Sequence, residues 1–92
     1  MIDNYEEKVY AGILGKIIGV FYGRPIEGWP YEKIKARFGM VDHFVAKDVG
    51  VPLHVADDDL SGTFTFFNAL EDYPLSKLGA AEFGDTWLNY LI

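Results

Sequence analysis

Three consecutive aspartates, Asp57, Asp58 and Asp59, are the strongest chemical feature of the sequence. Adjacent carboxylates repel one another unless water, a helix N-terminus or a cation neutralises them. Hard divalent cations such as Mg²⁺, Mn²⁺ and Ca²⁺ take oxygen ligands, and carboxylates at the start of a helix point toward a common region. The residues alone leave two interpretations open, a divalent metal site and a solvated acidic cap.

Two further residues are candidates for chemistry near such a site. Glu27 lies in the turn-forming segment 23–28 and is either a carboxylate that faces the same cleft as the aspartates or an ordinary surface residue. Trp29 follows this segment and either packs in the core or stacks on a flat ligand. His43 and His54 are isolated in sequence, with no serine or cysteine partner at a recognisable spacing, so a hydrolytic triad is not supported.

Length and composition limit the class of protein. The chain has 92 residues, of which 50% are hydrophobic, so it predicts one small domain with enough apolar material for a core. The net charge of -6 argues against a nucleic-acid or anionic-membrane partner. The sequence contains no cysteine, which is compatible with a cytoplasmic protein. The apolar stretch 9–22 is too short for a bilayer span and contains Lys16.

A buried helix is expected over residues 5–22. Its apolar residues recur at steps of three and four, the spacing of one helical face. Gly12, Gly15, Gly19 and Gly23 form a second stripe at similar steps. Each glycine costs a helix about 1 kcal/mol relative to alanine, so the stripe predicts a close contact, either a second helix or a ligand.

A short helix is predicted over Tyr31 to Phe38. Pro30 stands where this helix would begin and Gly39 where it would end. Residues 40–56 follow no regular period and predict a long irregular loop with one short strand.

Two more helices are predicted in the remaining chain. An aspartate of the acidic triplet can cap a helix that Pro74 ends, although the alternation over residues 63–66 also fits a strand. A last amphipathic helix is predicted from Ser76 onward, running to Ile92. Its apolar residues include Leu78, Ala81, Trp87, Leu88 and Leu91.

Three sequence pieces in this order resemble the ADP-ribosylglycohydrolase family. The first is the glycine-punctuated helix segment 11–19, the second is the Gly-x-Pro-x-Glu turn of segment 23–30, and the third is Ala56 with the acidic triplet, leading into segment 67–71. The match runs over nearly all of the chain. The resemblance implies an all-α fold, here a partial orthogonal helical bundle of about four helices with one long irregular loop.

The resemblance also implies a function. Members carry a dinuclear Mg²⁺ or Mn²⁺ centre and cleave ADP-ribose from modified side chains or related ribosides. Their early Thr-Asp-Asp metal motif maps onto Ala56, Asp57 and Asp58, with Asp59 supplying an oxygen in place of the missing hydroxyl. The glutamate that closes over the substrate ribose maps onto Glu27, while Val20 stands where family members often have an aspartate.

The second metal cluster of the family, an Asp-x-Asp-Ser/Thr motif, has no counterpart before Ile92. Residues 1–92 therefore resemble a single N-terminal segment of a longer hydrolase, which by itself is expected to be inactive. The substrate would be an ADP-ribosylated molecule or a small riboside. The competing interpretation is a non-enzymatic helical module, in which exposed helix faces mediate self-association and the aspartates only cap a helix.

Overall fold

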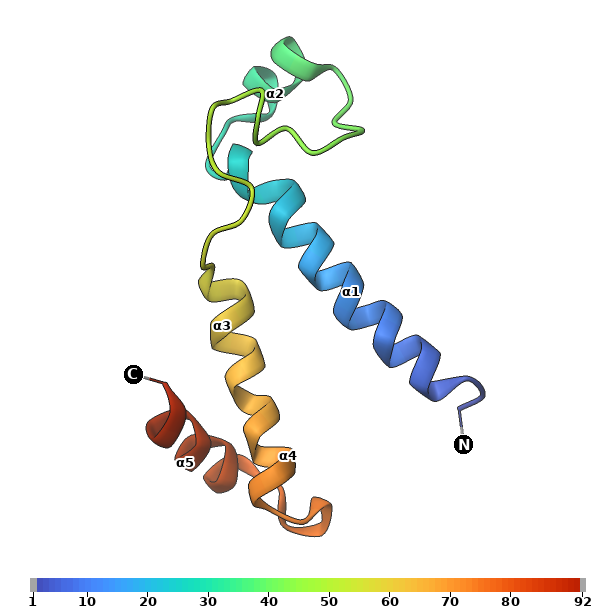
Figure 1. The fold of residues 1–92 in the computed structure, drawn as a ribbon, viewed down its shortest axis with the longest axis vertical. Coiled ribbons are helices and arrows are strands. Elements are labelled where there is room, and N and C mark those ends of the chain that lie inside the picture. Colours follow the sequence, from blue (N-terminus) through green and yellow to red (C-terminus); the bar gives the residue numbers. More distant parts are fainter. Residues whose placement is uncertain (1, 92) are drawn as a thin grey trace. The chain divides into compact units, whose positions relative to one another are not determined.

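The computed structural model describes residues 2–91 and is all-α (Figure 1). Its α-helices are α1 (Tyr5–Gly23), α2 (Tyr31–Phe38), α3 (Asp58–Phe64), α4 (Asn68–Asp72) and α5 (Ala80–Tyr90). Short 3₁₀ turns are η1 (Arg24–Ile26), η2 (Thr65–Phe67) and η3 (Leu75–Lys77). Because α3, η2 and α4 follow one another without a break and count as one helical segment, residues 2–91 contain about four helices. The predicted fold class is confirmed, while the orthogonal arrangement stays a prediction.

The chain divides into two compact units between Val55 and Ala56, and each is described by itself. None of the helices within residues 2–91 has the length and apolar character needed to cross a bilayer. The same residues contain no strand, so the short strand expected in segment 40–56 is absent. The prediction of a single segment over residues 1–92 stays a prediction.

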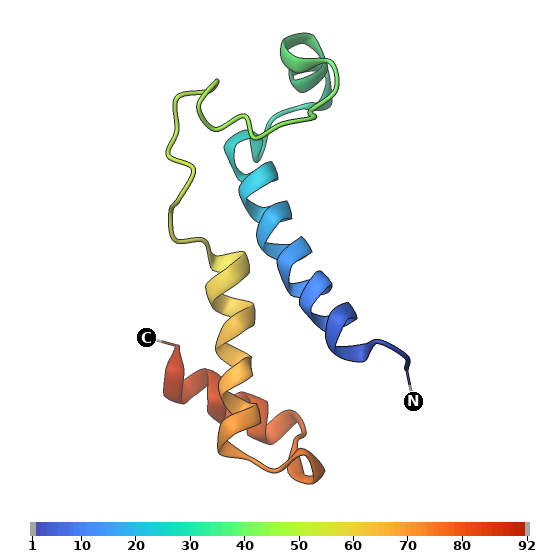
Figure 2. The ribbon, with the colours of Figure 1, turned by 45° about the vertical axis from the view of Figure 1, so that its right-hand side comes forward.

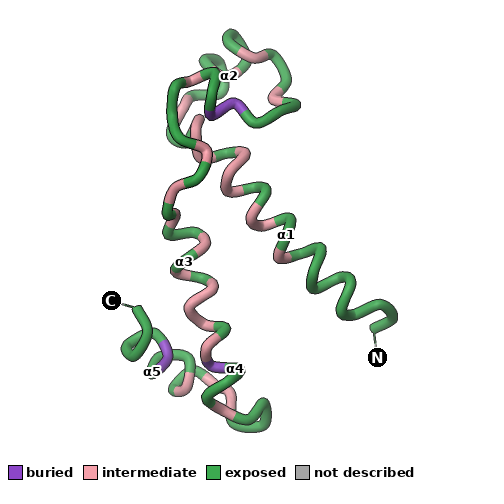
Figure 3. The backbone as a smooth tube through the Cα atoms, viewed as in Figure 1, coloured by how far each residue is buried: buried purple, intermediate pink, exposed green. Residues whose placement is uncertain are grey.

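In the N-terminal unit, helix α1 extends one residue beyond the predicted range 5–22. The Arg24 N–H still donates to the Val20 carbonyl, and the tighter turn η1 then begins at Arg24 with Pro25 in its first turn. No residue of α1 is buried, as Figure 3 shows along its whole length. Within this unit nothing lies within 4 Å of a Cβ built at the four glycines of the stripe, so the predicted close contact is not found there.

The core of the N-terminal unit lies in the loop after α2. Figure 2 shows this segment running back past the C-terminal end of α1. Val45 and Ala46 are the buried hydrophobic residues, at 0% and 3% exposure. The Tyr22 hydroxyl donates to the Val41 carbonyl at 2.7 Å, and its ring meets Phe44 edge-on at 5.4 Å. The loop is irregular in its backbone but has a defined position against α1.

Helix α2 spans the predicted residues. Pro30 precedes it with an extended backbone (φ −63°, ψ 148°), and Gly39 ends it at φ +69°. A positive φ of this kind favours glycine, which explains why the helix stops there.

The C-terminal unit is a helical hairpin in which the α3–α4 run packs against α5. The ring of Phe66 stacks on Trp87 with a centroid distance of 5.5 Å and meets Phe83 edge-on at 5.9 Å. Ala69 and Thr86 are buried between the two arms of the hairpin. These aromatic contacts join the two arms of the hairpin.

The helix predicted between the aspartates and Pro74 forms, whereas the last helix begins at Ala80 and not at the predicted Ser76. The alternation over residues 63–66, which also fits a strand, is helical here, and the Thr63 and Thr65 hydroxyls donate to the carbonyls of Asp59 and Ser61 one turn earlier. Helix α5 ends at Tyr90, with Leu91 extended (φ −84°, ψ 114°), and Ile92 lies outside the described residues.

The core assignment predicts the effect of truncating Val45. Valine-to-alanine replacement at this buried position should lower the free energy of unfolding by about 2 kcal/mol, from lost burial and the cavity left behind. Urea unfolding followed by Trp29 fluorescence in a Trp87→Phe background measures it. Val51→Ala is the matched control, because Val51 is 36% exposed and should lose less than about 0.5 kcal/mol. Equal losses in the two variants would contradict the assignment.

Candidate metal site

The three aspartates come together at the start of α3. One carboxylate oxygen from each of Asp57, Asp58 and Asp59 lies within 4.8 Å of the others. Asp57 is half-buried, whereas Asp58 and Asp59 are exposed. The structure therefore confirms that the triplet forms a cluster of carboxylates at a helix N-terminus.

Asp57 positions the cluster because it is the N-cap of α3. Its backbone is extended (φ −139°, ψ 132°), and its Oδ1 accepts a hydrogen bond from the Asp59 N–H at 2.9 Å. Its carbonyl accepts from the backbone N–H of Ser61 at 2.9 Å. Capping explains why an aspartate stands at position 57. Capping does not explain the aspartates at positions 58 and 59. Both lie in the first turn of α3, where the helix dipole favours a negative charge.

The spacing of the three oxygens suits a divalent cation after small side-chain rotations. Oxygens about 2.1 Å from an octahedral Mg²⁺ are about 3 Å apart when adjacent and about 4.2 Å apart when opposite. The observed limit of 4.8 Å exceeds the larger of these by less than an ångström. Because Asp58 and Asp59 are exposed, they can close this gap by changing rotamer. The donor set of three carboxylates fits Mg²⁺ or Mn²⁺.

Glu27 occupies a type II β-turn in the N-terminal unit. The turn is closed by the Trp29 N–H, which donates to the Ile26 carbonyl at 3.0 Å. Glu27 has φ −57° and ψ 133°, and Gly28 follows at φ +77°, the conformation that makes glycine favourable at this position. The Glu27 side chain is exposed, so its carboxylate is presented to solvent on a defined backbone.

Trp29 lies over helix α2. Its indole stacks on Phe38 with a centroid distance of 6.2 Å and an interplanar angle of 24°. The Lys33 ammonium lies 3.9 Å from the indole centroid, a cation–π contact. Trp29 is therefore half-buried in contact with Phe38 and Lys33, which fits the packing interpretation, and stacking on a flat ligand stays a prediction.

The predicted site residues fall into two groups. The aspartates begin the C-terminal unit, while Glu27 and Trp29 share one turn of the N-terminal unit. That Glu27 faces the same cleft as the aspartates stays a prediction.

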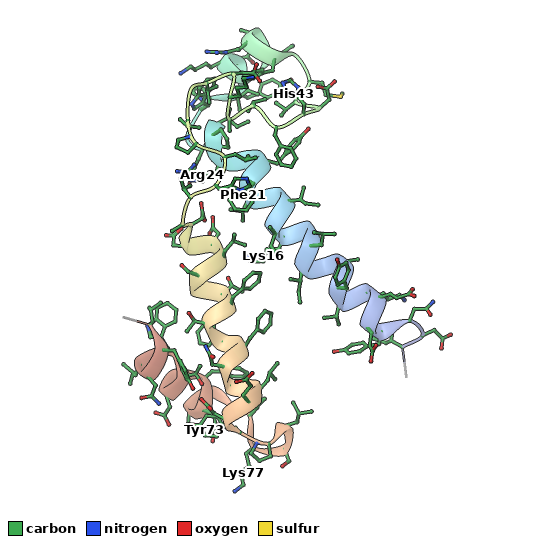
Figure 4. The ribbon with its side chains drawn as sticks, in the orientation of Figure 1. Lys16, Phe21, Arg24, His43, Tyr73 and Lys77 are labelled. Carbon is green, nitrogen blue, oxygen red and sulfur yellow. The ribbon has the colours of Figure 1, made fainter. Side chains whose placement is uncertain are left out.

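A cluster that the sequence did not indicate surrounds His43, which Figure 4 places beside α2. Its Nδ1 lies 2.9 Å from Asp42 Oδ1, and its Nε2 lies 3.0 Å from Asp48 Oδ2. Hydrogen bonds to Asp42 and then Asp48 raise the pKa of His43, and the bond to His43 lowers the pKa of Asp42. The only sequence signal is two aspartates within five residues of a histidine, a common spacing in loops.

Comparison with protein-family models, with curated proteins and with solved structures finds no match for this chain.

The capping role of Asp57 predicts different effects for two substitutions. Asp57→Ala should lower the free energy of unfolding by about 1 kcal/mol, because the Asp59 N–H loses its acceptor. Asp57→Asn should stay within a few tenths of a kcal/mol, since asparagine caps about as well. Metal-free urea unfolding followed by circular dichroism measures both. A loss in Asp57→Asn as large as in Asp57→Ala would show that the charge, and not the cap, matters for stability.

Proposed function

We propose that this chain is the N-terminal part of a metal-dependent hydrolase similar to the ADP-ribosylglycohydrolases, which releases ADP-ribose from a modified substrate or cleaves a related riboside. Asp57, Asp58 and Asp59 hold Mg²⁺ or Mn²⁺, and Glu27 and Trp29 contact the substrate. The observation that carries the proposal is the convergence of three carboxylate oxygens within 4.8 Å at one helix start. The order of the glycine-rich helix, the Gly-x-Pro-x-Glu turn and the acidic triplet supports it.

Each residue has a role that follows from its chemistry. A bound divalent cation polarises ribose hydroxyls or lowers the pKa of a bound water. The aspartates hold the cation, and the cap bond to the Asp59 N–H keeps Asp57 in place. Glu27 positions the ribose or accepts a proton from its exposed place in the turn. Trp29 holds the Lys33 ammonium over its ring beside the Glu27 turn, and this positive charge suits an anionic ligand.

The number of oxygen ligands in the aspartate cluster indicates that other protein groups supply the rest of the metal site. About six oxygen ligands surround each Mg²⁺ ion, and a dinuclear centre shares more donors than one triplet offers. Within residues 2–91, the three aspartates are the one group of three or more acidic or histidine side chains placed to hold a single ion. We infer that the remaining ligands come from outside these residues.

The exposed area supports the same inference. The chain exposes 7171 Å², while two separate compact globules of the lengths of its units would together expose about 6,500 Å². Among the described residues only Val45, Ala46 and Ala69 are buried hydrophobic residues. A sequence that is half hydrophobic normally buries far more, so additional protein surface is expected to cover it.

Self-association is the second candidate function, and the exposure of α1 favours it. Large apolar residues are exposed along this helix, namely Tyr5, Val9, Tyr10, Leu14 and Ile18. In a self-association module these side chains would pack on a second copy, and the aspartates would serve only as a helix cap. Metal binding separates the two candidates, because the module needs none.

The metal site predicts saturable binding of Mn²⁺ in a calorimetric titration of the chain. Asp57→Asn combined with Asp58→Asn should weaken binding about tenfold or more, because affinity follows the number of charged ligands. Asparagine retains the cap, so the fold is preserved. Asp3→Asn with Asp85→Asn is the matched control, since it removes the same charge at two positions outside the acidic triplet. Absence of heat at millimolar Mn²⁺, or equal weakening in the control, would favour the self-association module.

The incomplete donor set predicts that the chain alone releases no ADP-ribose from an ADP-ribosylated peptide in Mg²⁺. A longer form that carries a second acidic cluster should release it, and Asp57→Asn in that form should slow release about 100-fold or more. Chromatographic detection of free ADP-ribose measures both. Metal-dependent release by the 92 residues alone would contradict the proposed division of ligands.

A further inference from the structure

His43 lies between two carboxylates that approach opposite sides of its ring. Asp42 contacts Nδ1 at 2.9 Å and Asp48 contacts Nε2 at 3.0 Å. An ionised carboxylate only accepts hydrogen bonds, and a neutral imidazole carries a single N–H. Both contacts are therefore hydrogen bonds only when His43 is protonated. Since the two nitrogens face away from each other, this arrangement cannot serve as the ligand set of one metal ion.

The bridge joins both ends of the loop segment that contains the buried core. Val45 and Ala46 lie between Asp42 and Asp48, and both are buried. The segment closes with backbone bonds from the Val49 N–H to the Val45 carbonyl at 3.1 Å and from the Val51 N–H to the Ala46 carbonyl at 3.0 Å. When the His43 bridge opens, the segment loses the side-chain bonds that join its two ends and keeps the two backbone bonds from Val49 and Val51.

The same segment is attached to helix α2 beside the bridge. Arg37 donates from Nη2 to the Asp48 carbonyl at 2.6 Å, and its guanidinium lies 5.5 Å from the Phe38 ring centroid. Phe38 meets the His43 ring edge-on at 6.4 Å and stacks on Trp29. His43 thus contacts α2 through the Phe38 ring.

We propose that protonated His43 forms a pH-dependent clasp. Its hydrogen bonds to Asp42 and Asp48 close segment 42–48, and its ring contact with Phe38 holds this segment against the C-terminal end of α2. The charged groups that face it are Asp42 and Asp48 from the loop and Arg37 from α2. Two negative charges outweigh one positive charge there, so the surroundings favour the imidazolium. The clasp is a property of the N-terminal unit and does not depend on the proposed hydrolase activity.

The direction of the pH dependence follows from the shifts. Because the hydrogen bonds raise the pKa of His43, the clasp is complete below the ordinary histidine pKa of about 6.5 and opens as the pH rises through the raised value. The bond to His43 lowers the pKa of Asp42 from its ordinary value of 3.8. The Asp42–His43 contact therefore persists below pH 3.8 and is lost only as the pH falls through the lowered pKa. The clasp is thus closed in mildly acidic solution and open in alkaline solution.

Nuclear magnetic resonance of the whole chain tests the clasp in two ways. The imidazole protons of His43 should titrate with a midpoint above about 6.5, and Asp48→Asn should lower that midpoint. The Val49 and Val51 amides, corrected for intrinsic exchange, should lose about twofold to fivefold protection when His43 deprotonates, as for other exposed charge pairs. His43→Gln should abolish this pH dependence. His54→Gln is the matched control and should retain it.

Two outcomes would overturn the proposal. A His43 midpoint at or below about 6.5 in the unaltered chain would show that no clasp forms. Equal pH dependence of the two amides in His43→Gln and in the unaltered chain would show that another group controls the loop. The first measurement needs no substitution, so the test does not depend on the folding of a variant.

Discussion

The proposed function depends on how the negative charge of three adjacent carboxylates at the start of α3 is neutralised. The helix start neutralises part of it, because Asp57 accepts the Asp59 N–H and the positive end of the helix dipole faces the cluster. The cap and the helix dipole explain the presence of Asp57 fully and the presence of Asp58 and Asp59 only in part. In the proposed metal site, a divalent cation would neutralise the remaining negative charge through carboxylate oxygens, the ligands that Mg²⁺ and Mn²⁺ prefer. The proposed hydrolase activity depends on a divalent cation as the group that neutralises these carboxylates.

The second constraint is the small number of buried side chains. A half-hydrophobic chain with three buried hydrophobic residues in its described part is held by specific contacts more than by a core. In the N-terminal unit these include the Tyr22 bond to the Val41 carbonyl and the Tyr22 ring contact with Phe44, and in the C-terminal unit the Phe66 stack on Trp87. Such units gain stability from any surface that covers their apolar faces, whether from further protein or a second copy.

Local rules predicted the helices well and the tertiary contacts poorly. Helix α2 follows from Pro30 and Gly39, and the Asp57 cap follows from residue type, because both depend on near neighbours in sequence. The end of α5 at Tyr90 has no such marker in the sequence and was misjudged. The His43 bridge depends on how an irregular loop turns back, which no periodicity records. The glycine stripe indicated a close contact that its own unit does not supply.

The most direct test of the central claim is anomalous scattering from crystals of the chain grown with Mn²⁺. The metal-site account predicts an anomalous peak about 2.2 Å from carboxylate oxygens of Asp57, Asp58 or Asp59, as expected for direct coordination. A well-ordered α3 N-terminus with water and no anomalous peak beside these side chains would contradict it. The aspartates would then be a solvated helix cap.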